Sequence, residues 1–157
     1  MGERAYFVGE KPTKELEWYN KALKRCGTYG RLYSQTTFAI ARAYRQMHNN
    51  KLYGQYLVKS AISDIQGSVK ENAALQELAM YIFDLDHDNA TLAHSYLMAA
   101  MDDATFFNNK LRKLEISNRL PSIAAAYQQQ LQSQEKKIML FIIAVIVLAA
   151  GMFILYL

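Results

Sequence analysis

The feature that most restricts how this chain can fold is the apolar run from Ile138 to Leu157. These 20 residues contain no charged and no strongly polar side chain. A helix of that length spans roughly 30 Å, the thickness of a bilayer's hydrocarbon core. Apolar side chains would cover every face, whereas a helix packed on a soluble core usually keeps a polar stripe. The run therefore predicts a transmembrane helix, because a secretory signal would lie at the N-terminus.

The residues that flank this run bear on its orientation. Lys136 and Lys137 come directly before it, and Tyr156 lies near its end, where an aromatic side chain suits the membrane interface. By the positive-inside rule, the two lysines alone place the preceding residues in the cytoplasm, as in a tail-anchored protein.

The composition of the rest of the chain favours packed helices. Proline occurs twice, glycine seven times and tyrosine 11 times. The net charge is +4 and the basic residues are scattered, so we expect no bound nucleic acid. Cys26 is the single cysteine, and we expect it in a helix packing surface rather than in a disulfide.

Apolar periodicity and breakers predict a series of helices joined by short turns. Thr13 can cap the first helix and Gly27 can stop it. Pro121 is expected to open a seventh helix, because proline suits a first turn, and no breaker follows before the apolar run. The six helices expected before Pro121 cover residues 13–26, 32–47, 51–65, 71–85, 90–104 and 107–120.

Two stretches of this series repeat each other. Residues 38–65 align with residues 75–104 at an offset of 38 that becomes 39 after the turn. Small residues recur at the aligned positions, where they would let the two helices of one unit approach closely. The residues expected to pack the repeats are Ala41, Tyr44, Gly54 and Ala61 in the first unit and Ala79, Ala93 and Ala100 in the second.

This pattern resembles the tetratricopeptide repeat (TPR). Tyr44 matches the family's aromatic position, whereas Ile82 departs from it, and the usual period of about 34 residues is exceeded. The helix over 13–26 resembles the second helix of a unit whose first helix is missing. Since the chain also stops on the apolar run, we expect it to be a fragment of a longer protein.

The resemblance implies a concave groove, lined by the first helix of each unit, that binds a protein or peptide. The polar positions that could face it are Gln35, Arg42, Gln46, Gln76 and Tyr81. Packing between units is the alternative for the tyrosines, above all for Tyr44, Tyr53 and Tyr56.

A narrower resemblance rests on "SAISDI", "KENAALQELA", "MDDATFFN" and "RLPSI". These motifs resemble a Bacteroidetes-type family, described as a domain of unknown function, over the stretch from Arg31 through the apolar run. Its members carry periplasmic TPRs, one membrane helix, and a cytoplasmic coiled coil with a regulatory or DNA-binding tail. That resemblance implies periplasmic repeats, the opposite of what the two lysines indicate.

No motif in the chain predicts catalysis, a metal site or a cofactor. Asp84, Asp86 and Asp88 alternate as in a calcium loop, but Asn89 and Ser95 stand where that loop needs glycine and glutamate. Residues 86–89 are better interpreted as a turn. His87 and His94 have no third ligand nearby in sequence. We therefore do not expect an enzyme.

The sequence thus predicts an all-α, TPR-like solenoid of antiparallel helix hairpins, then a long helix running into one C-terminal transmembrane helix. The expected divisions are an irregular N-terminus (1–12), helical repeats (13–120), a connector (121–137) and the membrane helix (138–157). Two functions stay open. The chain is either the sensor part of a transmembrane signalling or transcription-regulatory protein, or a passive tail-anchored scaffold. Homodimerisation through the connector is left open.

Overall fold

The computed structural model describes residues 12–67 and 73–156, which are mostly helical and contain no strand. The predicted fold class, helix hairpins followed by a long apolar C-terminal helix, is confirmed. The helices are α2 (Pro12–Leu23), α3 (Arg31–Gln46), α4 (Asn50–Gln66), α5 (Ala74–Leu85), the 3-10 turn η1 (His87–Asn89), α6 (Ala90–Phe106) and α7 (Lys110–Tyr156).

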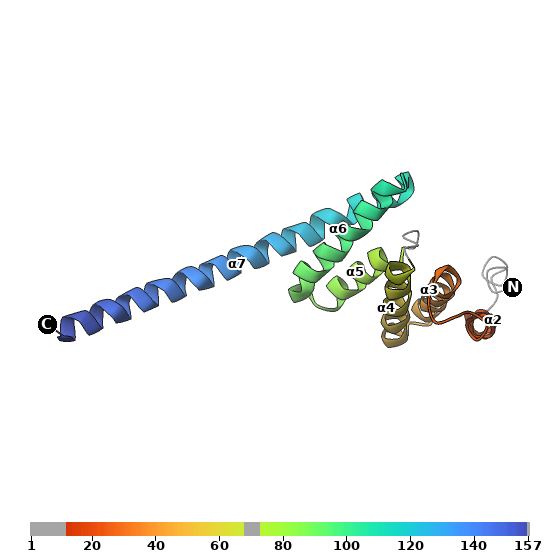
Figure 1. The fold of residues 1–157 in the computed structure, drawn as a ribbon, viewed down its shortest axis with the longest axis horizontal. Coiled ribbons are helices and arrows are strands. Elements are labelled where there is room, and N and C mark those ends of the chain that lie inside the picture. The colour runs from red at the N-terminus through yellow and green to blue at the C-terminus, as the bar shows by residue number, and fades with distance from the viewer. Residues whose placement is uncertain (1–11, 68–72, 157) are drawn as a thin grey trace.

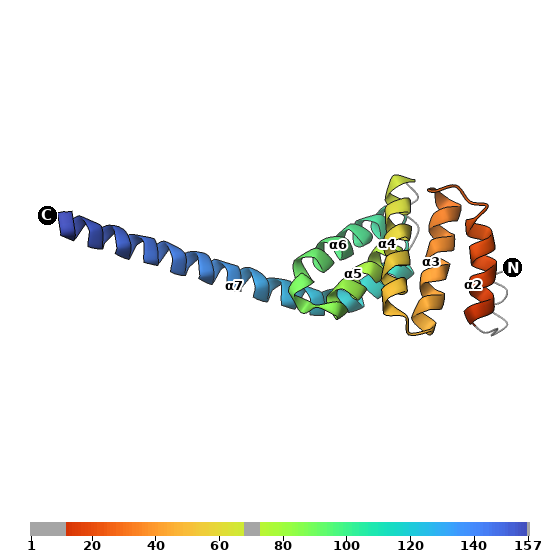
Figure 2. The ribbon, with the colours of Figure 1, turned by 90° about the horizontal axis from the view of Figure 1, so that it is seen from below.

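Each helix packs on the helix that follows it, so the repeats form a row (Figures 1 and 2). The helices α3 and α4 make one hairpin, and α5 and α6 make the next. The beginning of α7 packs on α6 and takes the place of the first helix of a third unit. The rest of α7 projects away from the repeats, and the C-terminus lies far from them (Figure 1).

The small residues singled out in the repeats are all buried. Ala41, Ala79 and Ala93 have no exposed surface. Tyr44 is partly buried, and its ring stacks on Tyr56 with centroids 5.6 Å apart. The alanines of this set lie in the buried clusters between the helices, and Gly54 lies against Tyr81 of α5, while their role in repeat packing stays a prediction.

The predicted helix ends needed correction at two turns. The first helix ends at Leu23, so Cys26 lies in a turn instead of on a helix surface, with its Sγ 3.9 Å from Thr36 Oγ1. The carbonyl of Ala22 accepts hydrogen bonds from the amides of both Arg25 and Cys26, a tightening common in a last helical turn.

The second correction concerns the predicted start of a helix at Phe107. Asn108 has a left-handed φ of 50°, and α7 begins only at Lys110. The predicted irregular segment 1–12 and the first two residues of the predicted helix 71–85 lie outside the described residues, apart from Pro12, which begins α2.

Pro121 does not open a new helix, because it lies inside α7. A proline there leaves the carbonyl of residue 117 without its helical donor and costs about 3 kcal/mol. Ile116 and Ile123 lie on either side of it, both with no exposed surface. Each buried isoleucine contributes about 1.5–3 kcal/mol. Packing against α6 therefore keeps the helix continuous across the proline, whose ring faces solvent.

The continuous helix has consequences for the end of the chain. Its 47 residues extend over roughly 70 Å at 1.5 Å per residue. Its C-terminal part is long and apolar enough to cross a membrane, and the most apolar stretch is wholly exposed. Lys136, Lys137 and Tyr156 are also exposed along this helix. A core-forming helix would be mostly buried, so this stretch serves no core within the described residues.

Candidate functional site

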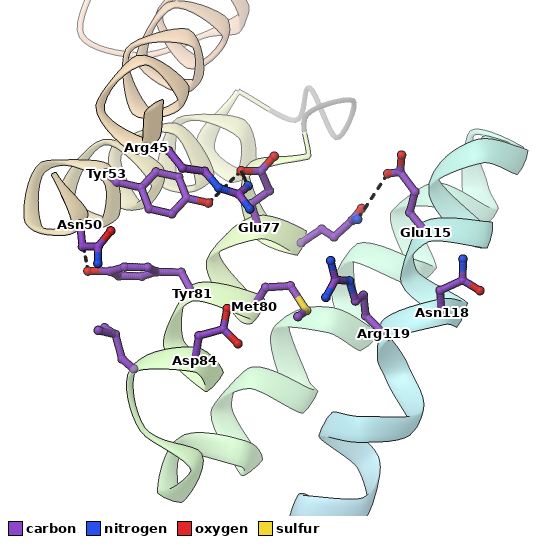
Figure 3. Close-up of a pocket in the computed structure, with 12 residues that line it drawn as sticks. Arg45, Asn50, Tyr53, Glu77, Met80, Tyr81, Asp84, Glu115, Asn118 and Arg119 are labelled. Atoms are coloured by element: carbon purple, nitrogen blue, oxygen red, sulfur yellow. Dashed lines mark hydrogen bonds and ion pairs between the residues drawn. The ribbon is translucent and has the colours of Figure 1, made fainter. Parts of the chain in front are cut away.

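A groove of about 610 Å³ that could hold a ligand is lined by residues of α3, α4, α5 and the beginning of α7 (Figure 3). Three of these helices, α3, α5 and α7, are the first helices of successive units. Its lining residues are Arg45, Asn50, Tyr53, Gln76, Glu77, Met80, Tyr81, Asp84, Leu85, Glu115, Asn118 and Arg119.

One wall of the groove carries a compact polar cluster. The phenol of Tyr53 donates a hydrogen bond to Glu77 Oε2 at 2.9 Å, and Arg45 Nη1 lies 3.5 Å from the same oxygen. Burial and then the Glu77 carboxylate raise the pKa of Tyr53, so its phenol keeps its proton. The charge of Glu77 is therefore matched within the protein by Arg45.

Tyr81 forms a second wall of the groove. Its phenol donates to the backbone carbonyl of Asn50 at 2.9 Å, and its ring meets Tyr53 edge-on with centroids 5.3 Å apart. A β-carbon at position 54 would overlap the Tyr81 ring, so the ring can lie here only because Gly54 has no side chain. The hydroxyls of both tyrosines are thus already engaged, and the rings form a fixed surface.

Gln76 is the least satisfied polar residue of the groove. Only 8% of the residue is exposed, and its Nε2 donates to Glu115 Oε2 at 3.4 Å. Its Oε1 is buried and has no hydrogen-bond partner. The amide cannot be turned round without cost, since a carboxylate only accepts hydrogen bonds and so must face the NH₂ group. The Gln76 Oε1 is therefore a buried hydrogen-bond acceptor without a donor.

Three further groups line the groove without partners. The side chains of Asp84, Asn118 and Arg119 are exposed, and none of them forms a hydrogen bond or ion pair with another described residue. Asp84 lies on α5 and the other two on α7 (Figure 3). These groups are free to contact a ligand, whereas Arg45 and Glu77 already contact each other.

Sequence reasoning found part of this site. Gln76 and Tyr81 line the groove as expected, whereas Gln35, Arg42 and Gln46 are exposed on α3 outside it. The acidic residues and Arg119 were missed. Helical spacing could have found them, because residues 77, 81 and 84 share one face of α5 and residues 115, 118 and 119 share one face of α7.

His87 and His94 pack against aromatic rings. The ring of His87 lies 4.4 Å from that of Phe83, and His94 stacks on Tyr127 with centroids 4.5 Å apart. Asp86 accepts a hydrogen bond from the amide of Asp88 and so organises the turn. No group of three or more potential metal ligands occurs within the described residues.

Stacked helix hairpins with a polar groove are typical of TPR proteins, a class of generally non-catalytic modules that bind proteins or peptides. The chain belongs to the SusR N-terminal TPR domain family, whose sequence model matches residues 1–118. No match was found among curated proteins or among solved structures.

Proposed function

We propose that this chain is the membrane-anchored binding part of a transmembrane signalling or transcription-regulatory protein, and that it captures a protein or peptide in its groove. One observation carries the proposal: a single helix, α7, both lines the groove and supplies the apolar run. Glu115, Asn118 and Arg119 lie at its beginning, and residues 138–156 at its end. A ligand that touches α7 therefore touches the helix that would enter the membrane.

The attachment of α7 to the repeats supports a mechanical role. Ile116 and Ile123 are fully buried against α6. Farther along, Gln130 bridges α7 to the turn between α5 and α6. Its Nε2 donates to the Asp88 carbonyl, and its Oε1 accepts from Thr91 N at 3.2 Å and from Thr91 Oγ1 at 3.0 Å. Only about 12 Å of helix separates Gln130 from Ile138.

The proposal also assigns a side of the membrane. We place the repeats in the periplasm, as the narrower resemblance implies, with Lys136, Lys137 and Tyr156 flanking the span. The test uses Ser133→Cys in a Cys26→Ser background, because residue 133 is exposed and lies before the span. A reagent that cannot cross the inner membrane should label it in cells with a permeabilised outer membrane. Labelling only after lysis would reverse the orientation.

A passive scaffold is the second candidate, favoured by Lys136 and Lys137, which would hold the repeats in the cytoplasm. The experiment that separates the two inserts a flexible Gly-Ser linker after Gln130 in the full-length parent. A sensor should keep ligand binding and lose its output, since the linker breaks the rigid path along α7. An unchanged output would refute transmission through this helix. The passive scaffold would then be the remaining candidate function.

A further inference from the structure

We infer that two copies of this chain pair side by side through the exposed sides of α4 and α6, so that α4 of each copy lies against α6 of the other. The inference does not depend on the groove or on its ligand. It rests on three observations: the opposite net charges of the two hairpins, the apolar side chains exposed along both helices, and the direction in which these helices run.

The two hairpins carry opposite net charges. Residues 12–67 contain nine lysines and arginines and three acidic residues, which gives a net charge of +6. Residues 73–109 contain six acidic residues and no lysine or arginine, which gives a net charge of −6. When the first hairpin of each copy faces the second hairpin of the other, opposite charges meet twice, because twofold symmetry repeats every contact.

The exposed sides of α4 and α6 also offer apolar surface. Val58, Ile62 and Ile65 follow one side of α4 at helical spacing and are 41–66% exposed. Leu92 and Met98 are exposed on α6. A hollow of about 320 Å³ separates the two helices, and it is lined by Ala61, Asp64, Ile65, Leu75, Ala99, Asp102 and Asp103. Covering this surface with a second apolar surface removes it from water, which favours association.

The topology allows both copies to be anchored in one bilayer. The helices α4 and α6 are the second helices of successive hairpins, so both run in the same direction, and α7 runs back along α6 (Figure 1). A twofold axis along these helices places α4 of one copy over α6 of the other and leaves their directions unchanged. Both apolar ends of α7 then point to the same side, as one membrane requires.

The same symmetry predicts which residues meet. Residues equally far from the starts of α4 and α6 lie opposite each other, and Val58 and Met98 are such a pair. Lys59 of one copy then lies about three residues, or roughly 4.5 Å, along the helix from Asp102 of the other. A lysine side chain spans that offset. Both residues are exposed, so the contact joins a cation to a carboxylate beside the apolar stripes.

The charges also favour a second copy over an unrelated partner. A wholly acidic or wholly basic protein would meet one hairpin of its own sign. An unrelated partner would need both charges in the reverse order at the same spacing, whereas a second copy presents them in that order by symmetry. Anchoring in one bilayer holds two copies at the same height, which raises their effective concentration.

The test measures pairing of the full chain in phosphatidylcholine vesicles by energy transfer. Donor and acceptor dyes are attached at Ser133→Cys in a Cys26→Ser background, since residue 133 is exposed on α7 away from α4 and α6. The wild-type pair should give transfer above that of random encounter. Raising NaCl from 0.1 M to 1 M shortens the screening length from about 10 Å to about 3 Å and should lower the association constant at least about threefold.

Two charge reversals identify the contact. Lys59→Glu or Asp102→Lys alone puts like charges at both symmetric contacts and should lower the association constant at least about tenfold. A mixture of the two variants should pair within about threefold of wild type. In a mixed pair the new glutamate faces the new lysine at one contact, and the native lysine faces the native aspartate at the other.

A matched control reverses the same charges elsewhere. Lys24→Glu and Asp88→Lys change exposed residues that lie outside α4 and α6, one in each hairpin. Each control should pair within about twofold of wild type, because screened charges remote from a contact contribute little.

Three results would overturn the inference. The first is wild-type transfer no higher than random encounter, and the second is wild-type pairing that salt does not weaken. Both are measured without a substitution, so misfolding of a variant cannot cause them. The third is pairing that both reversals leave unchanged, or that the mixture fails to restore although circular dichroism shows each variant folded. In that case the copies meet elsewhere, for example along their membrane helices.

Discussion

The ring of Tyr81 on α5 lies directly over Gly54 on α4, in the space that any larger residue at position 54 would need. A β-carbon there would overlap Cε1, Cζ and the hydroxyl oxygen of Tyr81. The contact joins two successive units, since Gly54 belongs to the first hairpin and Tyr81 to the second. It also fixes the wall of the groove, because the same ring contacts Tyr53 and its hydroxyl reaches the Asn50 carbonyl.

Gly54→Ala should therefore destabilise the protein by about 1–3 kcal/mol, because Tyr81 must leave its place and lose both contacts. A loss of stability is informative here, because alanine in a helix interior otherwise stabilises a protein by about 0.5–1 kcal/mol relative to glycine. Chemical unfolding followed by circular dichroism measures the change. Gly151→Ala is the control, because nothing lies within 4 Å of a β-carbon at that position. In a Tyr81→Ala background the cost of Gly54→Ala should disappear, and a persistent cost would locate the strain elsewhere.

Gln76→Leu should stabilise the ligand-free protein by about 1 kcal/mol. The substitution keeps a similar side-chain volume and removes a buried acceptor that has no partner, while the hydrogen bond it loses to Glu115 is long. A lower unfolding midpoint for this variant would mean that an unseen donor satisfies Gln76 in the free protein.

The fold was predictable because small residues and helix breakers repeat along the chain. Ala41, Gly54 and Ala61 recur as Ala79, Ala93 and Ala100, and all six are buried. Such spacing is a local property, so it can be read from one sequence. The apolar run is equally local, since its length and composition alone predict a helix that could span a bilayer.

What could not be predicted depends on contacts between distant segments. Pro121 has the local signature of a helix start, but burial of Ile116 and Ile123 on α6 keeps the helix continuous. The groove is similar, because Gln76 meets Glu115 only after α7 folds back beside α5. Periodicity gives the face of each helix, but not which faces of different helices converge.

The continuous helix leads to a prediction for Pro121→Ala. If α7 runs through this position, alanine gives the carbonyl of residue 117 its missing donor and should stabilise the protein by up to about 3 kcal/mol. Pro12→Ala is the matched control, because Pro12 begins α2, where a missing amide proton costs nothing. Thermal unfolding of both variants makes the comparison. Equal, small effects at the two positions would indicate that a new helix begins at Pro121 after all.

The raised pKa of Tyr53 predicts how stability depends on alkaline pH. The folded protein keeps the phenolic proton above the ordinary pKa of 10.0, whereas the unfolded chain releases it there. The resulting stabilisation is present below pH 10 and is lost as pH rises further, by about 1.4 kcal/mol per pH unit. Tyr53→Phe should lower the free energy of unfolding by about 1–3 kcal/mol at pH 7, since it removes a hydrogen bond to the Glu77 carboxylate. Unfolding measured from pH 7 to 11 should show the two curves converging above pH 10, and parallel curves would contradict the assignment.

Gln130 should decide how firmly α7 is held to the turn that precedes α6. Gln130→Ala removes its bonds to the Asp88 carbonyl and to both donors of Thr91. Because the site is exposed, the global stability should fall by about 1 kcal/mol or less, while the turn opens locally far more often. Hydrogen exchange read by mass spectrometry should show faster exchange over 86–91 and no change in α3 or α4.

Gln129→Ala, at the neighbouring exposed glutamine that makes no such bond, should leave exchange over 86–91 as in wild type. Equal protection in both variants would show that Ile116 and Ile123 alone hold the helix, and the proposed path from groove to membrane would then bypass this turn.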